Sequence, residues 1–378
     1  MKRRRPASPT RTRKRAPAGA APVPPPAALG FRMPAEWEPH AATWIAWPHE
    51  PRDWPGKLPA IDWVYGEVVR HLAVGERVRI IVSTAAVAKR AREVLRRVGV
   101  DKTRVQLFPA PTDRSWTRDY CPIYITNGDG EVAITNWRFN GWAKYANHKR
   151  DDAVNDRIAR ADKRRQWQPT AAIRKRVARV VLEGGAIDVN GAGTLLATEE
   201  CLLDEKKQAR NPGLGREGIE QVLSAHLGVR KVLWLGRGIT GDDTHGHVDD
   251  LARFVDETTV VVAQVSDPDD VDYDPLRENR ARLERMTTAD GKPLRVLSLP
   301  MPAPLFLDGI RLPASYANFY IGNEAVIVPT FNDPNDRLAL QILTGLFPTR
   351  RVVGIHAVDL VWGFGTLHCM TQQEPAGS

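Results

Sequence analysis

Buried-strand and amphipathic-helix patterns alternate along the chain from about residue 31 onward. Short runs rich in Val, Ile, Leu and Trp, which are typical of buried strands, alternate with segments of helical apolar spacing. The predicted strands are 41–47, 77–83, 132–139, 179–185, 193–198, 231–235 and 258–265. The predicted helices are 61–74, 84–100, 216–228, 274–286 and 335–347. This alternation predicts an α/β fold.

The alternating units have similar lengths and the same order, but no repeat is recognisable by residue identity. The segment 149–176 is polar and dense in charge. We interpret it as an exposed helix with a connecting loop, and a phosphate-binding patch is the alternative. No linker rich in Pro, Gly or Ser divides the rest of the chain, so we expect a single catalytic domain over residues 32–378.

Residues 1–31 differ from the rest of the chain. They hold eight Lys or Arg residues and no acid, together with many prolines and almost no large apolar side chain. Such a segment cannot bury enough surface to offset its ordering entropy, so we predict a disordered, basic tail rich in Pro and Ala. The prolines also interrupt the apolar stretch that an export signal would need.

The positive charge of the protein belongs mostly to this tail. The chain of 378 residues has a net charge of +9, but without the tail 46 basic and 45 acidic side chains remain. A nearly neutral body does not favour nucleic acid as a partner, although the tail itself could contact nucleic acid or an anionic surface. The composition leaves association into a homo-oligomer open.

Hydropathy and cysteine content limit the compartments in which we expect the protein. No apolar run reaches the roughly 18 residues that a membrane-spanning helix needs, so we expect no membrane partner. The three cysteines are too few, and odd in number, for a disulfide framework. This count indicates a reducing compartment, and we expect a cytoplasmic protein.

Two short segments carry carboxylates that folding alone does not explain. In the segment 116–122 (WTRDYCP), Asp119 either serves a site or pairs with its neighbour Arg118. In 182–185 (LEGG), Glu183 ends an apolar run, where an unpaired carboxylate is costly to bury. Glu183 therefore needs a partner from the protein or from a ligand, unless it lies in a plain turn.

A third segment, 241–250 (GDDTHGHVDD), concentrates two histidines and four aspartates. If the chain is extended there, His245, His247 and Asp249 project from one face of a strand. With Asp250 they would suit a zinc or manganese ion. They would equally suit a proton-transfer centre in which His247 is the general base and Asp249 binds a positive charge.

A fourth segment, 362–373 (WGFGTLHCMTQQ), offers a cysteine after a glycine-rich run. Cys369 is either a nucleophile or a buried core thiol. Its neighbour His368 should point to the opposite face of an extended chain, so His247 is the better candidate for its base. We assign Cys121 and Cys201 to the core.

Taken together, these residues indicate a particular reaction. A ring of carboxylates would oppose the oxyanion that forms in a protease or esterase. It would suit a planar guanidinium, which pairs with carboxylates through forked hydrogen bonds. A thiolate could attack the carbon of that cation while a histidine protonates the departing ammonia, and water would then hydrolyse the adduct. The residues therefore imply guanidine hydrolysis.

The chain resembles the agmatine deiminase/bacterial-type peptidylarginine deiminase family of the guanidino-group-modifying superfamily. The resemblance runs through residues 33–375 in family order. It rests on the segments 33–48 (MPAEWEPHAATWIAWP), 116–122, 139–142 (FNGW), 182–203, 241–254, 311–323 (RLPASYANFYIGN) and 365–375. It implies a pseudo-fivefold α/β propeller of ββαβ-like modules around a central active-site channel.

The resemblance also implies the roles of the site residues. Cys369 would be the nucleophile and His247 the general acid and base. Asp119 and Asp249 would bind the guanidinium, and Glu183 would bind it or orient His247. Trp116 would help to wall the pocket. The family uses no metal and no other cofactor for its chemistry, which favours the proton-transfer interpretation of the third segment.

The expected reaction is the hydrolysis of agmatine to N-carbamoylputrescine and ammonia through a cysteine thiouronium intermediate, a step toward putrescine. Peptidyl-arginine or free arginine, giving citrulline, are alternative substrates. Two further alternatives are a metal-dependent hydrolase built on the third segment and a binding protein without catalysis. The chain departs from the family pattern at Cys121 and Phe364, and the residues that contact the far end of the substrate are not identified by sequence.

Overall fold

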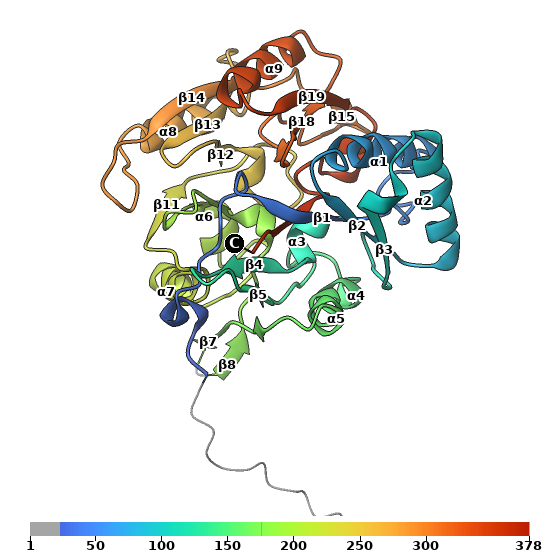
Figure 1. Ribbon diagram of the computed structural model, residues 1–378. Coiled ribbons are helices and arrows are strands. Elements are labelled where there is room, and N and C mark those ends of the chain that lie inside the picture. The colour runs from blue at the N-terminus through green and yellow to red at the C-terminus, as the bar shows by residue number, and fades with distance from the viewer. Residues whose placement is uncertain (1–22, 175, 378) are drawn as a thin grey trace, which may run out of the picture.

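The computed structural model describes residues 23–174 and 176–377 (Figure 1). The predicted disorder of residues 1–22 therefore lies outside the described residues. Residues 23–31 differ from that prediction, because they include the 3-10 helix η1 (Pro26–Leu29). Phe31 is buried, with its ring centroid 5.4 Å from that of Trp167. The described body thus begins earlier than the proline-rich composition suggests.

Five sheets of three or four strands organise the described residues, each with its own helices. The first contains β1 (His40–Ala46), β2 (Arg77–Val82), β3 (Val105–Pro109) and β20 (Gln372–Pro375), with α1 (Leu58–Leu72) and α2 (Ala85–Arg97). The second contains β4 (Ile123–Thr126), β5 (Val132–Thr135) and β6 (Gln166–Trp167), with α4 (Lys149–Asp152) and α5 (Val154–Ala161). The third contains β9 (Asp188–Val189), β10 (Thr194–Thr198) and β11 (Lys231–Leu235), with α6 (Glu199–Leu203) and α7 (Gly215–Leu227).

The last two sheets follow the same plan. The fourth contains β12 (Ala252–Phe254), β13 (Thr259–Gln264) and β14 (Arg295–Pro300), with α8 (Tyr273–Leu283). The fifth contains β17 (Tyr320–Ile321), β18 (Ala325–Thr330) and β19 (Arg351–His356), with α9 (Asn335–Leu346). Two short hairpins complete the described strands: β7 (Thr170–Ile173) with β8 (Arg176–Arg179), and β15 (Phe306–Leu307) with β16 (Ile310–Arg311).

One strand order recurs in all five sheets. The middle strands β5, β10, β13 and β18 each pair antiparallel with the preceding strand and parallel with the following one. In the first sheet β1 pairs parallel with β2, and its antiparallel partner is β20 from the other end of the described chain. A helix connects each parallel pair, as a parallel connection requires. The repeat is one of topology, which explains why residue identity does not reveal it.

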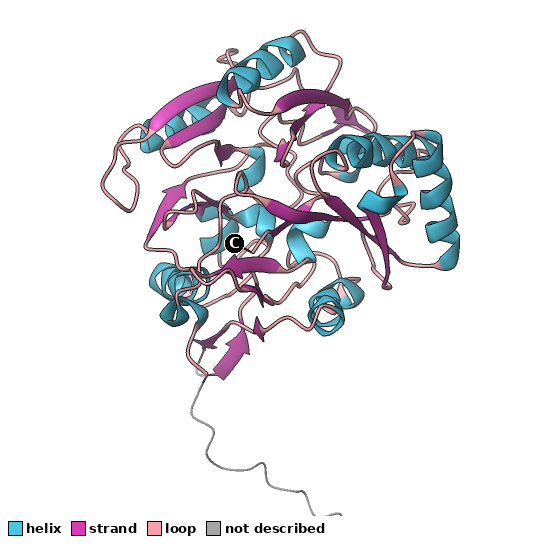
Figure 2. Ribbon diagram, in the orientation of Figure 1, coloured by secondary structure: helices cyan, strands magenta, loops and turns pink. Residues whose placement is uncertain are grey.

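Buried strands and amphipathic helices produce this architecture. All residues of β1 except Ala41 are buried, as expected for a strand covered on both faces. Helix α2 begins where the Thr84 hydroxyl accepts a hydrogen bond from the Val87 N–H, and it buries Val87, Ala91 and Leu95 on one side. The longer helices lie at the periphery and the sheets inside them (Figure 2).

Two predictions about elements are wrong. The run 179–185 is not a strand, because Arg179 ends β8 and only an isolated bridge between Arg138 and Val181 follows. The apolar side chains of this run are buried without a continuous strand pairing. The segment 149–176 does contain the predicted helix, but its second part forms short strands rather than a loop.

Two global observations bear on the expected setting of the protein. Within the described ranges, no helix is long and apolar enough to cross a membrane. Cys121, Cys201 and Cys369 are all free and buried.

Candidate active site

The predicted site residues lie on connections between the sheets rather than within strands. Asp119 belongs to the short helix α3 (Thr117–Tyr120), and Glu183 precedes the 3-10 helix η3 (Gly184–Ala186). His247 precedes the 3-10 helix η4 (Val248–Asp250), which contains Asp249. Cys369 lies between the 3-10 helix η5 (Leu360–Gly363) and β20. The fold brings all five side chains to one buried place, as the following distances establish.

Asp119 lies beside His247 and is held by two neutral donors. Its Oδ1 atom is 3.8 Å from His247 Nδ1 and accepts a hydrogen bond of 3.1 Å from the Gly185 N–H. Its Oδ2 atom accepts a hydrogen bond of 2.8 Å from the Trp142 indole. Arg118 instead bonds Glu36, 3.1 Å away, so the simple pairing of Asp119 with its sequence neighbour does not occur.

Asp249 connects the nucleophile candidate to the histidine. Its Oδ2 atom is 3.7 Å from Cys369 Sγ, and its Oδ1 atom is 4.0 Å from His247 Nδ1. The same Oδ2 atom is 2.7 Å from His368 Nδ1. Cys369, His247 and Asp249 therefore form one continuous group of buried side chains.

Gly185 packs directly against this group. A Cβ atom at this position would lie 2.5 Å from His247 Nδ1, 2.9 Å from Asp119 Oδ1 and 3.1 Å from Asp249 Oδ2. No side chain fits there without displacing these three groups. The glycine that follows Glu183 thus allows the backbone to approach the site closely.

Glu183 is paired with an arginine that the sequence analysis did not identify. Arg210 Nε lies 3.2 Å from Glu183 Oε1, and both side chains are completely buried. Arg210 also donates to the carbonyl oxygen of Thr244, in the segment that leads to His247. Cys201, which we assigned to the core, is buried there, and its sulfur lies within 4.8 Å of ligand atoms of Glu183 and His247.

Several buried polar atoms of the site have no hydrogen-bond partner among the described residues. They are Asp249 Oδ1, Glu183 Oε2 and both ring nitrogens of His247. Buried polar atoms in native proteins almost always have partners, so these four atoms are suited to hydrogen-bond a polar ligand. Two free carboxylate oxygens favour a ligand that is rich in N–H donors.

Burial and charge shift the ionisation of the site. Burial raises the pKa of Asp119 to about 6, against the opposing influence of His247. Burial alone would raise the pKa of Asp249, but the hydrogen bond from His368 and nearby positive charges hold it below its usual value. Burial would lower the pKa of His247, yet Asp119 and Cys201 raise it well above the ordinary value.

The thiol is also strongly perturbed. Burial, together with the negative charges of Asp249, Asp250 and Asp119, raises the pKa of Cys369 well above its ordinary value. Asn318 opposes this surrounding charge at close range, because its side-chain N–H₂ donates to Cys369 Sγ at 3.1 Å. A cation placed between the carboxylates would favour the thiolate in the same way.

The metal-binding alternative requires an extended segment that the structure does not have. His245 has a left-handed backbone with φ of 67°, and Gly246 has φ of 90°. The chain therefore turns, and His245 Nε2 lies 2.9 Å from Asp204 Oδ2 instead of facing His247. Neither group of potential metal ligands found among the described residues includes His245. The prediction that His245, His247 and Asp249 share one face is thus wrong.

A narrow cavity leads to Cys369. It is lined by Cys369, Asp119, Trp116, Trp142, Arg114, Asp243, Thr244, Gly363 and Phe364. Trp116, which the resemblance places at the pocket, is one of these lining residues, and its ring lies 5.3 Å from that of Trp54. His247 and Asp249 do not line the cavity but contact the lining residues Asp119 and Cys369, respectively.

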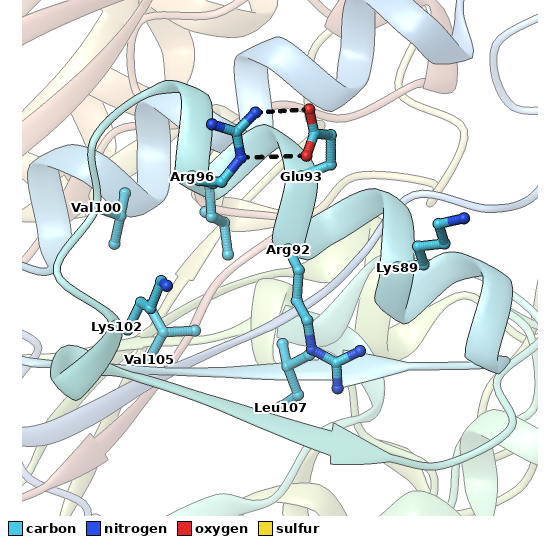
Figure 3. A pocket seen from close by; sticks show the side chains of 9 residues that line it. Lys89, Arg92, Glu93, Arg96, Val100, Lys102, Val105 and Leu107 are labelled. Atoms are coloured by element: carbon cyan, nitrogen blue, oxygen red, sulfur yellow. Dashed lines mark hydrogen bonds and ion pairs between the residues drawn. The ribbon is translucent and has the colours of Figure 1, made fainter.

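A roomier cavity of about 570 Å³ lies elsewhere, between α2 and β3 (Figure 3). Leu95, Val105 and Leu107 contribute its apolar surface, and Arg92 is one of several cations around it. In the close-up, Glu93 is paired with Arg96. Neither histidine nor cysteine occurs among its described lining residues, so size alone does not identify the reactive site.

Five residues around the site were not singled out from the sequence. The carbonyl oxygen of the Asn318 side chain accepts hydrogen bonds from the backbone N–H groups of His368 and Cys369, at 3.0 and 3.3 Å. The other residues are Glu36, Trp142, Arg210 and His368. Glu36 and Asn318 occur in the segments 33–48 and 311–323, whose resemblance to the family was the available signal.

Comparison with known proteins gives matches over nearly the whole chain. Residues 32–375 match the model of the family described as Porphyromonas-type peptidyl-arginine deiminase. Agmatine deiminase of Ectopseudomonas mendocina is 37% identical, with 93% of this chain and 97% of the relative covered. Agmatine deiminase of Pseudomonas fluorescens is also 37% identical, with the same coverage of both chains.

Solved structures agree with these matches. Agmatine deiminase of Enterococcus faecalis superposes with a TM-score of 0.84 at 34% identity, covering 96% of this chain and all of the other. A Cys-to-Ser variant of C. jejuni agmatine deiminase with substrate bound gives 0.80 at 29% identity, covering 92% and 97%. The resemblance inferred from sequence motifs is thereby confirmed.

Proposed function

Because the chain belongs to the Porphyromonas-type peptidyl-arginine deiminase family, we propose that it is an agmatine deiminase. It would hydrolyse agmatine to N-carbamoylputrescine and ammonia, a hydrolysis at a C–N bond of a linear guanidino compound. The relatives named agmatine deiminase, which match almost all of this chain, support this choice of substrate.

The observation that carries the proposal is the convergence of a thiol, a histidine and carboxylates in one buried place beside the narrow cavity. Cys369, Asp249 and His247 follow one another in contact, and Asp119 and Asp249 both lie near the Nδ1 atom of His247. A guanidinium lying against Asp119 and Asp249 would satisfy the free Oδ1 atom of Asp249. Its planar carbon would then face the sulfur.

The reaction follows from these positions. The Cys369 thiolate attacks the guanidinium carbon, and a C–N bond breaks as His247 gives its proton to the leaving ammonia. The substrate remains bound to sulfur as a thiouronium. Water gives one proton to His247 as its oxygen adds to the same carbon. The C–S bond then breaks and restores the thiolate, and the remaining hydroxyl proton passes to solvent or to the released ammonia, which leaves the neutral urea group of N-carbamoylputrescine.

The ionisation of the free site suits a cationic substrate. The raised pKa of the thiol keeps Cys369 protonated when the carboxylates around it are unmatched. Binding of a guanidinium adds a positive charge beside the sulfur and so lowers the cost of forming the thiolate. His247, whose pKa is raised well above its ordinary value, carries the proton that the leaving group needs.

The mouth of the cavity contains groups of both signs, which bear on the far end of the substrate. Asp243 pairs with Lys144 and accepts a hydrogen bond of 2.7 Å from the Tyr145 hydroxyl. A carboxylate there suits the ammonium of agmatine. Arg114, 2.5 Å from Asp53, is the group that would favour a substrate carboxylate, so free arginine is the second candidate.

The five-sheet arrangement suits the fold that the resemblance implies. We propose that the five ββαβ units form a pseudo-fivefold α/β propeller in a single domain over residues 32–378. The recurring strand order and the distribution of the sheets around the middle of the molecule support this interpretation (Figure 1). The site residues come from connections of several units, as expected for a central channel.

The test is an assay of ammonia release with agmatine, free arginine and a blocked arginine peptide, each with and without EDTA. We expect turnover with agmatine, much lower kcat/KM with the other two, and no effect of EDTA. Preference for the peptide or for arginine would refute agmatine as the substrate. Loss of activity with EDTA would support the alternative that the protein is a metal-dependent hydrolase.

A matched pair of variants tests which cysteine is the nucleophile. Cys369→Ala should abolish ammonia release. Cys121→Ala removes another buried free thiol, which does not line the cavity, and should remain active. Mass spectrometry of quenched wild-type enzyme should detect the substrate adduct on Cys369, and an adduct on any other residue contradicts the assignment.

A further inference from the structure

His368 is enclosed between two carboxylates. Its Nδ1 atom lies 2.7 Å from Asp249 Oδ2, and its Nε2 atom lies 2.8 Å from Glu36 Oε2. The imidazole is almost completely buried, as are both acids. Our sequence interpretation excluded His368 as the base of its neighbour Cys369 and gave it no other role.

The two short contacts determine where protons must lie. A neutral imidazole has a single N–H and can donate to only one of two acceptors. The other nitrogen would then face a carboxylate oxygen with lone pairs on both atoms, at a distance typical of a charge-assisted hydrogen bond. Two donated hydrogen bonds require either an imidazolium or a protonated carboxyl group.

The surroundings of Glu36 favour the imidazolium. Arg253 lies 2.8 Å from Glu36 Oε1, and Arg118 lies 3.1 Å from Glu36 Oε2. Burial alone would raise the pKa of Glu36, but Arg253, His368 and Arg118 hold it well below its usual range. Glu36 is therefore a carboxylate, and the proton between it and His368 belongs to the ring.

We infer that His368 is a positioning residue, an imidazolium that donates to both Glu36 and Asp249 and so fixes Asp249 for substrate binding. With Oδ2 held by the imidazolium, the Asp249 carboxylate presents its unpartnered Oδ1 atom to the space beside His247. Glu36 in turn fixes the imidazolium and is itself fixed by two buried arginines. The catalytic consequence rests on the proposed function, whereas the protonation state does not.

The charged groups around His368 come from several elements. The ring itself contacts Glu36 from the N-terminal loop and Asp249 from η4. Arg118 from α3 and Arg253 from β12 face Glu36, Asp188 from β9 faces Arg253, and His247 lies 4.0 Å from Asp249. The two acids in direct contact with the ring are therefore the ones to which an imidazolium would donate.

The direct test is ¹⁵N NMR of histidine-labelled enzyme without substrate at pH 7. The resonances of His368 are assigned by their loss in His368→Gln. We expect both ring nitrogens of His368 to show imidazolium shifts, because each donates to a carboxylate. A neutral tautomer would overturn the inference whether or not the protein deiminates agmatine.

A second variant keeps the test informative if His368→Gln folds poorly. Glu36→Gln leaves the ring in place but removes one of its two acceptor charges. We expect the ¹⁵N shift of His368 Nε2 to change, because a neutral carboxamide accepts its N–H less strongly than a carboxylate does. An imidazolium that does not respond to Glu36→Gln contradicts the proposed role of Glu36.

The kinetic test uses His368→Gln with His356→Gln as the matched control, since His356 is exposed at the end of β19. We expect KM for agmatine to rise about tenfold or more, the loss of one charge-assisted interaction, with a smaller change in kcat. The acidic limb of kcat/KM should move to higher pH as Asp249 loses its cation. If kcat fell by the same factor as KM rose, and the acidic limb of kcat/KM did not move, His368 would have only a structural role. A wild type inactive on every guanidino substrate would refute the proposed function but not the NMR result.

Discussion

The two carboxylates expected to bind the guanidinium are equally buried but ionise differently. Asp119 has neutral donors, the Trp142 indole and the Gly185 N–H, and its pKa is raised to about 6 chiefly by burial. Asp249 has the His368 ring at 2.7 Å, and its pKa is held below the usual value despite burial. Neutral hydrogen-bond donors thus hold Asp119, whereas the His368 ring, which we infer to be charged, holds Asp249.

This difference separates two tasks within one site. A carboxylate with a buried cation behind it stays ionised over the whole working range and provides a fixed negative charge. A carboxylate held only by dipoles and by His247 changes its charge near neutrality. We therefore expect Asp249 to give constant affinity and Asp119 to govern how activity depends on pH.

The largest effect should come from replacing the sulfur of Cys369, the atom that both acids are expected to orient the substrate toward. Cys369→Ser should lower kcat at least about 1,000-fold, because an alcohol beside these carboxylates is a far poorer nucleophile. Agmatine binding should persist, since both acids remain, and it can be measured by calorimetry. Substantial turnover by the serine variant would show that the acids do not converge on a reacting sulfur.

Replacing each aspartate with asparagine should show that Asp249 and Asp119 contribute unequally to kcat/KM. Asp249→Asn leaves the buried His368 cation facing a neutral amide, where it repels the substrate, so we expect a loss in kcat/KM of about 1,000-fold. Asp119→Asn leaves His247 nearby, but at 3.8 Å this ring makes no hydrogen bond as short as that between His368 and Asp249, so we expect a loss nearer 100-fold. Thermal denaturation of both variants controls for folding, and the reverse order of losses would contradict the comparison.

The pH profile should report Asp119. Only its ionised form binds the guanidinium, so kcat/KM should fall as the pH decreases through about 6. The raised pKa also means that the folded protein holds this proton more tightly than the unfolded chain. Asp119 therefore stabilises the fold at low pH, and that contribution is lost as the pH rises through 6. Asp119→Asn should lack the acidic limb near pH 6, and an unchanged limb would assign it to another group.

The smallest expected effect concerns the indole that supports Asp119. Trp142→Phe retains an aromatic ring edge-to-face with Phe139 but removes the N–H donor. We expect kcat/KM to fall about tenfold and its acidic limb to move upward, because the carboxylate loses a hydrogen bond to its charged form. Trp137→Phe is the matched control, since its indole bonds Thr135 away from the cavity. Equal effects in the two variants would refute a specific role for Trp142.

Local patterns identified the elements whose own residues determine their form. The apolar runs of β1 and β2 and the helical spacing of α2 needed no distant information. The failures occurred where tertiary contacts decide. The apolar run at 179–185 is buried by packing alone, and the segment at His245 turns because two successive residues have positive φ.

The residues of the site also divide into those that the local sequence identifies and those that it does not. A cysteine, a histidine and acids in unusual surroundings suggested the chemistry without knowledge of the fold. Glu36 and Asn318 are ordinary polar residues whose importance comes from partners far along the chain. Glu36 bonds a ring 332 positions away, and Asn318 bonds a sulfur 51 positions away. Such long-range pairings have no local signature.

The pairing of β1 with β20 has a consequence for how the protein comes into being. Trp44 lies opposite Gln372 in this antiparallel pair, and Cys369, the proposed nucleophile, is on the segment that enters β20. During translation, β1 is synthesised more than 300 residues before β20, so the first sheet cannot be complete until synthesis is nearly finished. We therefore expect deiminase activity to arise only after the whole chain has been made, when the same segment completes the first sheet and brings the proposed nucleophile to the site.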